Sequence, residues 1–148
     1  MNKIILLGRL TKDPEIRYTQ ATEPMCVAKY TIAVNRRFKK EGKQDVDFIN
    51  CVSFAKAGEF VERFLKKGMA ICLSGSLQIE EYTDKNGQRQ WFTQVVTEEI
   101  DFTESREAYE ARMSRNSNNN NTSPQKNYEP DNFSAIAKSI DDDDDLPF

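Results

Sequence analysis

Hydrophobic and polar residues alternate along most of the first hundred or so positions, which is the pattern of strands with one buried face. In the clearest case, Tyr30 and Ile32 alternate with Lys29 and Thr31. Turn-forming residues separate such stretches, with Asp13-Pro14 after the first and DKNG between the last two. The pattern predicts about five strands, at residues 2–10, 26–34, 46–54, 69–83 and 90–102.

One segment, residues 57–68, has helical rather than alternating spacing. Lys66 and Lys67 suit the last turn of a helix, where cations meet the negative end of the helix dipole, and Gly68 suits the C-cap. We therefore expect one helix between the third and fourth strands. Its apolar residues would form a single stripe, made of Phe60, Val61, Phe64 and Leu65.

Five strands with one helix after the third suit an all-β fold, a small closed barrel of the oligonucleotide-binding (OB) type. A plain antiparallel sandwich is the structural alternative. The single inserted helix favours the five-stranded barrel, so residues 1–103 are expected to form one OB-fold domain.

The character of the chain changes after Phe102. Residues 104–139 are polar, rich in asparagine and interrupted by Pro124 and Pro130, so they cannot bury enough apolar surface to form a core. We interpret them as a disordered linker, with a helix over residues 104–115 left open. The chain then ends on residues 140–148, an acidic segment with an apolar tip.

Charge is unevenly distributed along the chain. Residues 1–103 carry 16 Lys or Arg and 14 Asp or Glu, a net charge of +2, whereas residues 104–148 carry 5 and 10, a net charge of −5. A mildly basic domain joined to an acidic tail indicates nucleic acid as a partner. No signal peptide or membrane span is visible, so we expect a cytoplasmic protein without a membrane partner.

Composition excludes several catalytic and metal-binding classes. The chain has no histidine, which removes Ser-His-Asp and Cys-His catalysis and histidine-ligated metals. Its glycines are dispersed, so no phosphate-binding loop is present. Cys26, Cys51 and Cys72 lack a CxxC pair and are expected to be buried free thiols. We expect a protein without catalytic residues, cofactor or metal.

Residues 46–54 place aromatic rings on a face that a small barrel cannot bury. Alternation puts Phe48, Asn50 and Phe54 on one face and Ile49 and Cys51 on the other. If Ile49 and Cys51 fill the inside, the two phenylalanines face outward, where bases of single-stranded nucleic acid can stack on them. The alternative is a flipped strand that carries both rings into the core.

Two more rings lie among basic residues. Phe38 stands in RRFKK, where a core position is unexpected, and Tyr82 precedes the DKNG turn near Lys85 and Arg89. Cations beside a ring suit phosphate contacts that flank a stacked base. Rings and basic residues interleaved in three separate segments therefore indicate a surface for single-stranded nucleic acid.

Longer stretches of the chain resemble a known family. They are NKIILLGRLTKDPEIRYT, IAVNRRF, DFINCVSF, FLKKG, GSLQ, YTDKNGQ and the terminal DDDDDLPF. In this order they are similar to the bacterial and phage single-stranded DNA-binding proteins (SSB), from Asn2 to about Phe102 and again at the very end. The resemblance implies an OB fold, a homotetramer and a nucleoid-associated protein that coats single-stranded DNA in replication, recombination and repair.

The resemblance also assigns roles to individual residues. It places four rings at base-stacking positions, namely Phe38, Phe48, Phe54 and Tyr82. Several of these are often tryptophan in relatives, whereas the single tryptophan here is Trp91. The basic positions expected near DNA are Lys3, Lys56 and Lys67. Further phosphate contacts are expected from the loop residues Arg36, Arg37, Lys39, Lys40, Lys85 and Arg89.

In the same family the acidic terminus is a docking peptide for genome-maintenance proteins, such as helicases, nucleases, recombination mediators, and primase or polymerase subunits. An apolar pocket in a partner would take Leu146 and Phe148, and Pro147 would restrict the backbone. A basic rim would take the acidic block of Asp141, Asp142, Asp143, Asp144 and Asp145. The same acids are expected to compete with DNA for the basic surface.

Three other functions stay open on the sequence alone. An OB-fold adaptor of a replication complex would bind mainly protein, although it would not need the acidic tail. A nuclease would need converging carboxylates that bind a metal. An RNA chaperone would use the same stacking surface, because stacking reads neither sugar.

Overall fold

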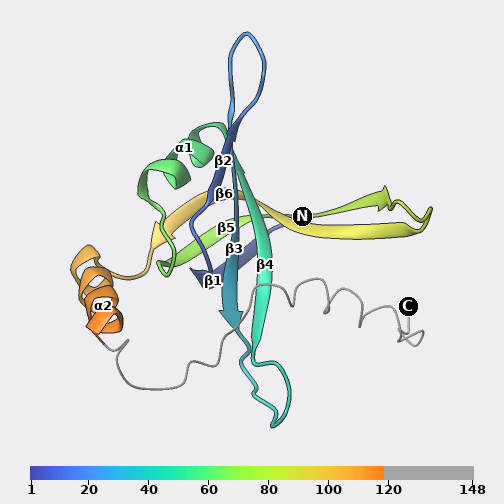
Figure 1. The fold of residues 1–148 in the computed structure, drawn as a ribbon. Helices are drawn as coiled ribbons and strands as arrows, with labels where there is room; N and C mark the ends of the chain where they lie inside the picture. The colour runs from blue at the N-terminus through green and yellow to red at the C-terminus, as the bar shows by residue number, and fades with distance from the viewer. Residues whose placement is uncertain (119–148) are drawn as a thin grey trace. The chain divides into compact units, whose positions relative to one another are not determined.

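The computed structural model describes residues 1–118, and strands make up about half of them (Figure 1). In chain order its elements are β1 (Ile4–Leu10), β2 (Glu15–Tyr18), β3 (Cys26–Asn35), β4 (Val46–Phe54), α1 (Ala55–Phe64), β5 (Ala70–Thr83), β6 (Arg89–Phe102) and α2 (Arg106–Asn118). Residues 1–112 form one unit, and residues 113–118, the end of α2, belong to a second. The expectations for Asp141 to Phe148 lie outside the described residues.

The six strands form one sheet in the order β1-β5-β6-β4-β3-β2. β1 also pairs with β3, through Arg9–Ala33 and Leu10–Ile32. The strands β1, β5, β6, β4 and β3 therefore form a ring, with β2 attached to β3. The β4–β6 pair is parallel and the other pairs are antiparallel. This mostly β arrangement, with α1 after β4, is consistent with the expected OB fold. No helix among residues 1–118 is long and apolar enough to cross a membrane.

β2 is a sixth strand that the sequence pattern did not predict. The chain turns at residues 11–14, as expected around Pro14, and then pairs with β3 from Glu15–Lys29 to Tyr18–Cys26. In β2 only Ile16 packs against the core. Four residues with one inward apolar side chain show too little alternation to be recognised.

The core lies inside the ring of strands. Tyr30 brings a polar group into it, and its Oη donates a hydrogen bond to Thr97 Oγ1 at 3.0 Å and pairs with Ser53 Oγ at 3.1 Å. Burial raises the pKa of Tyr30 to about 12, so the hydroxyl keeps the proton that it donates. The buried cluster consists of Leu10, Ala28, Tyr30, Ile32, Cys51, Val61, Leu65, Ile71, Leu73 and Val95.

Helix α1 differs from its predicted form. It ends at Phe64, with Leu65 as the C-cap residue, so the two following lysines lie in the next turn and Gly68 is not the cap. Of the predicted stripe only Val61 and Leu65 are buried, whereas Phe64 is exposed and Phe60 packs between Phe64 and Phe102. The helix also begins earlier than expected, at Ala55 instead of residue 57. Its buried side is therefore made of Gly58 and Val61, with Leu65 just after its end.

The predicted linker opens with an ordered segment. α2 covers residues 106–118, whereas the sequence left a helix open only over residues 104–115. Two of its side chains hold it to the turn after α1, because Tyr109 Oη donates to the Lys67 carbonyl at 2.9 Å and Arg112 donates to the Gly68 carbonyl at 2.7 Å. Arg112 also pairs with Glu104 at 2.9 Å. The first part of α2, beyond the predicted domain end at residue 103, is therefore held to the turn after α1.

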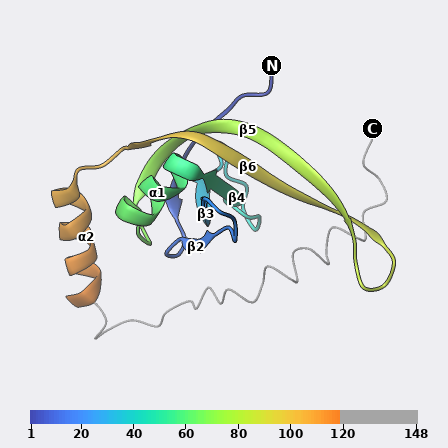
Figure 2. The same ribbon diagram turned by 90° about the horizontal axis from the view of Figure 1, so that it is seen from above.

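β5 and β6 extend well beyond the other strands as a two-stranded ribbon (Figures 1 and 2). β6 pairs with β4 only over Val95–Thr97, so residues 78–94 have no third strand beside them in the described chain; we call these residues the arm. At its base a bulge leaves Glu98 unpaired between Thr97 and Glu99. The DKNG turn closes the arm as predicted, with Gly87 at φ +80°.

Candidate nucleic-acid interface

Strand register places four aromatic rings on one side of the sheet, which we call the outer face. Paired residues point to the same side, and Val52 of β4 pairs with Val96 of β6. Alternation along each strand then adds Phe48 and Phe54 from β4 and Phe92 from β6. Tyr82 joins them, because its partner Gln90 lies two residues before Phe92. The outer-face rings are therefore Phe48, Phe54, Phe92 and Tyr82.

These rings are partly exposed at the surface. Phe48 is 40% exposed and Phe54 is 39% exposed, whereas Cys51 between them is buried on the opposite side. The predicted outward orientation of Phe48 and Phe54 is thus confirmed, and the flipped strand is wrong. A half-exposed ring with a fixed stem offers a flat face to a base at a low cost in side-chain entropy.

Val52 limits how much of this face is open. It points outward with Phe48 and Phe54, yet it is only 2% exposed. Its neighbours across the strands are Lys29 of β3 and Val96 of β6. The outer face of β4 is therefore exposed at Phe48 and Phe54 but covered at Val52 between them.

Phe38 lies in the loop between β3 and β4 and is the most exposed of the predicted rings, at 79%. The Arg37 guanidinium carbon lies 5.6 Å from the ring centroid, within the range of a cation–π contact. A ring held beside a guanidinium can stack on a base while the cation reaches the adjoining phosphate.

Phe92 was missed at the sequence level. Its signal was available, because residues that face each other across a hairpin can be counted outward from the DKNG turn. Counting in this way puts Phe92 diagonally beside Tyr82 on the same face. The same register adds Lys29 to the outer face, since Lys29 pairs with Val52.

Three of the predicted phosphate-binding residues are already engaged in ion pairs. Lys3 Nζ lies 2.7 Å from Glu98, and the hydrogen bond to this carboxylate raises the pKa of Lys3. Arg36 makes a bidentate pair with Asp47, with a shortest distance of 2.6 Å, and this bond lowers the pKa of Asp47. Arg89 lies 3.2 Å from Glu81. All three pairs are exposed, so phosphate could replace the carboxylates at small cost.

The other predicted cations have no ion pair within residues 1–118, and they occupy separate places. They are Arg37, Lys39, Lys40, Lys56, Lys67 and Lys85. Three of them surround Phe38, and Lys85 lies in the turn of the arm. Lys56 instead lines a hollow with the carboxylates of Glu98, Glu99 and Asp101, where phosphate would be repelled. The structure therefore supports the loop cations better than Lys56.

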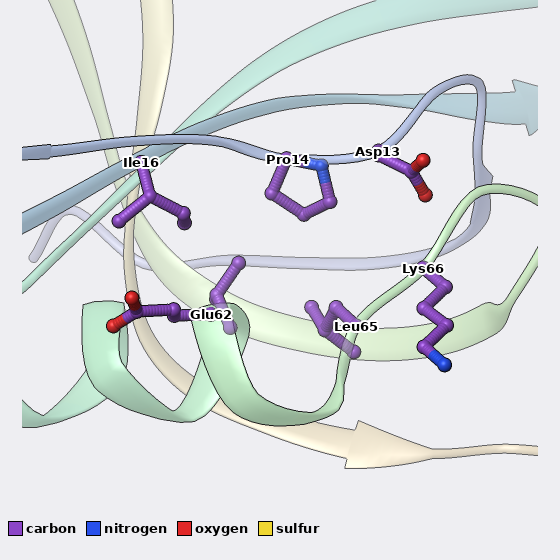
Figure 3. Close-up of a pocket in the computed structure, with 7 residues that line it drawn as sticks. Asp13, Pro14, Ile16, Glu62, Leu65 and Lys66 are labelled. Atoms are coloured by element: carbon purple, nitrogen blue, oxygen red, sulfur yellow. The ribbon is translucent and has the colours of Figure 1, made fainter.

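A hollow between α1 and the segment that leads into β2 has different chemistry (Figure 3). Pro14 and Ile16 from the β2 side face Leu65 from the end of α1, and the cavity holds about 250 Å³. Asp13 and Glu62 outnumber Lys66 among its charged groups. Two carboxylates beside one ammonium do not suit a phosphate backbone, so this hollow is not part of the interface.

The three cysteines are free thiols, as expected. Cys26 and Cys51 are buried, whereas Cys72 is only partly buried. Burial raises the pKa of Cys51 to about 12, which keeps it as an inert thiol in the core.

Comparisons with known proteins agree with this geometry. The model of the single-strand binding protein family matches residues 1–103. The chain is 42% identical over 161 residues to Single-stranded DNA-binding protein 2 of Listeria monocytogenes, covering 100% of this chain and 99% of the relative. It is 40% identical over 148 residues to Single-stranded DNA-binding protein 3 of Clostridium acetobutylicum, covering 100% of both. The chain belongs to the single-strand binding protein family.

Proposed function

We propose that the protein binds single-stranded DNA without sequence specificity and without catalysis. The observation that carries this proposal is the set of exposed rings on the outer face, together with the exposed Phe38, whose neighbours Arg37, Lys39 and Lys40 have no ion pair within residues 1–118. Any base can stack on a phenylalanine or tyrosine ring, and each stacked base contributes about 1–3 kcal/mol. A duplex hides its base faces, so it would lack this contribution.

The finer role is to coat single strands in the cytoplasm, on the nucleoid, during replication, recombination and repair. Coating needs no nucleotide hydrolysis, because binding only the unpaired form removes hairpins by mass action. The family membership supports this role, and the names of the full-length relatives fit it.

We also propose that the strands close into an OB barrel that assembles as a homotetramer. The edge of β1 supports assembly, because residues 4–8 pair with β5 alone among the described residues. Ile5 and Leu7 of this strand are exposed on the outside of the sheet. An open strand edge beside two exposed aliphatic side chains is suited to pairing with another copy. Replacing Ile5 and Leu7 together by glutamate should lower the mass measured by light scattering.

The decisive experiment is a fluorescence anisotropy titration of a labelled oligo-dT of about 35 nucleotides, with a duplex of equal length alongside. We expect tight binding to the single strand, weak binding to the duplex and a fall in affinity with salt. Phe48→Ala and Phe54→Ala should each weaken binding, while Phe64→Ala, an exposed ring on α1, should not. Equal binding by all variants would contradict the stacking surface.

The proposed partner recruitment depends on residues 141–148. Deleting them should abolish pull-down of genome-maintenance proteins and tighten DNA binding at low salt, because five aspartates no longer compete for the cations. A control chain in which only Leu146 and Phe148 become serine keeps the charge. It should lose the partners and retain the competition. Partner binding that survives the full deletion would contradict the docking function.

A further inference from the structure

The arm also has a second side. Of the residues predicted to contact DNA, only Arg89 lies on this side. On β6 the side chains of residues 89, 91, 93, 95 and 97 point to the same side, and Val95 and Thr97 are buried. This side of the arm therefore continues the inner face of the ring. Trp91 lies on it, opposite Glu81, whereas Tyr82 and Phe92 lie on the other side. We call this side of the arm the inner arm face; it carries Ile79, Glu81, Thr83, Arg89, Trp91 and Thr93.

This face exposes two large apolar side chains among polar ones, and no third strand among the described residues lies beside it. Trp91 is 64% exposed and Ile79 is 62% exposed, with Leu77 also exposed nearer the ring. Ile79 pairs with Thr93, two residues beyond Trp91, so the indole and the aliphatic side chain are diagonal neighbours. Figure 2 shows no other strand or helix of residues 1–112 over the outer part of the arm. A tryptophan in this position indicates a binding surface rather than a core.

Besides its exposed apolar side chains, the inner arm face carries a cation, Arg89. The sequence placed Arg89 with Tyr82, but the register separates them, because Arg89 lies on the same side as Trp91. Two residues apart on one strand, their side chains are about 7 Å apart along β6. The pair of Arg89 with Glu81 joins side chains that are mostly exposed and is weak, so the guanidinium can exchange to a phosphate. Arg89 and Trp91 are thus neighbours on one side of β6, without the ring contact that Arg37 makes with Phe38.

We propose that Trp91 and Arg89 form an additional single-strand contact, with a base stacked on the indole and the adjoining phosphate held by the guanidinium. A long strand would follow the outer face, pass around the arm near Lys85 and reach the inner arm face. A second copy fits this face less well, because protein interfaces bury a dry apolar centre and here a charged pair adjoins the ring. The inference rests on the proposed DNA binding and extends it to a new residue pair.

The experiment uses the only tryptophan of the chain as its reporter. Unlabelled oligo-dT of about 35 nucleotides is titrated into the full chain under selective tryptophan excitation, with anisotropy of the labelled strand in parallel. We expect the emission to be quenched as the anisotropy rises. Trp91→Ala should weaken binding by about 5- to 150-fold, the factor that corresponds to one stacked base. Trp91→Phe should retain most of the affinity, because it keeps a ring.

Two further measurements separate the possible outcomes. Tyr82→Ala is the matched control on the other side of the arm, and it should lower affinity while the Trp91 emission is still quenched at saturation. Binding by anisotropy with unchanged emission, and wild-type affinity for Trp91→Ala, would overturn the inner arm contact alone. Acrylamide that fails to quench the free protein would show the ring covered by another copy and would also overturn it. No anisotropy change with the wild-type chain would instead refute the proposed function.

Discussion

The base of the β5–β6 ribbon and its arm carry similar residues in opposite surroundings. At the base, Ile71, Leu73 and Val95 are buried in the core. In the arm, Ile79 and Trp91 continue the same alternation on the same two strands and are mostly exposed. β1 and β4 flank the base, and no strand among the described residues flanks the arm.

The comparison shows that alternation sets which side a residue faces, and neighbouring strands decide whether that side is buried. A two-stranded ribbon has no third strand and contributes little stability by itself. Apolar side chains in the arm are therefore available for binding. The following predictions test this division, from the largest expected effect to the smallest.

Truncating one apolar residue at each end of the ribbon should have very different effects on stability. Leu73→Ala leaves a cavity in the core, because Leu73 is 1% exposed, and should lower the free energy of unfolding by about 2–5 kcal/mol. Ile79→Ala should change it by about 0.5 kcal/mol or less, as for an ordinary surface substitution. Urea denaturation of both variants measures the difference. Similar losses would mean that the arm is packed in solution.

A methyl group at the bulge should disturb the junction between base and arm. A Cβ on Gly75 would lie 2.0 Å from the Val96 carbonyl oxygen, which is backbone and cannot move aside freely. Gly75→Ala should therefore cost about 1–3 kcal/mol, as for overpacked sites. Ser76→Ala, the next position on β5, is the control and should be nearly neutral. A wild-type melting temperature for Gly75→Ala would contradict the close approach.

The outer side of the arm should affect DNA affinity rather than stability. Tyr82→Ala and Phe92→Ala should each weaken binding to single-stranded DNA by about 1–3 kcal/mol if each ring stacks on one base. Neither change removes a fully buried group. Anisotropy titrations at fixed salt measure the affinities, with circular dichroism as a check on folding. An effect of Tyr82 without one of Phe92 would limit the stacking row to the sequence-predicted rings.

The smallest effect is expected from the Arg36–Asp47 pair beside Phe38. The hydrogen bond from Arg36 lowers the pKa of Asp47 below its ordinary value of 3.8. A carboxylate with a lowered folded-state pKa stabilises the fold at neutral pH, and this stabilisation is lost as the pH falls through that lowered value. Asp47→Asn should therefore be slightly less stable than the wild type near neutral pH and equal to it in strong acid. Urea midpoints at the two pH values check the sign.

Much of the fold could be predicted from the sequence because its signals are local. The five expected strands, the DKNG turn and the inward positions of Tyr30 and Ile32 are confirmed. β2 could not be found, because a four-residue strand is defined by its partner β3. The end of α1 was misplaced, because the lysines after Phe64 satisfy the charge rule in a turn as well as in a helix.

Of the candidate site, the sequence by itself determined that Phe48 and Phe54 share one side of β4 and that Phe38 stands among cations, because alternation and composition are properties of short segments; the structure decided that this side of β4 faces outward. Only the tertiary structure decided that Val52 is covered, that Lys3 and Arg36 are paired with carboxylates, and that Arg89 faces away from Tyr82. The physical reason is that burial, ion pairing and the side of the ribbon on which a residue lies depend on strands distant in the chain. Where those strands stop, at the base of the arm, the same alternating sequence changes from core to exposed surface.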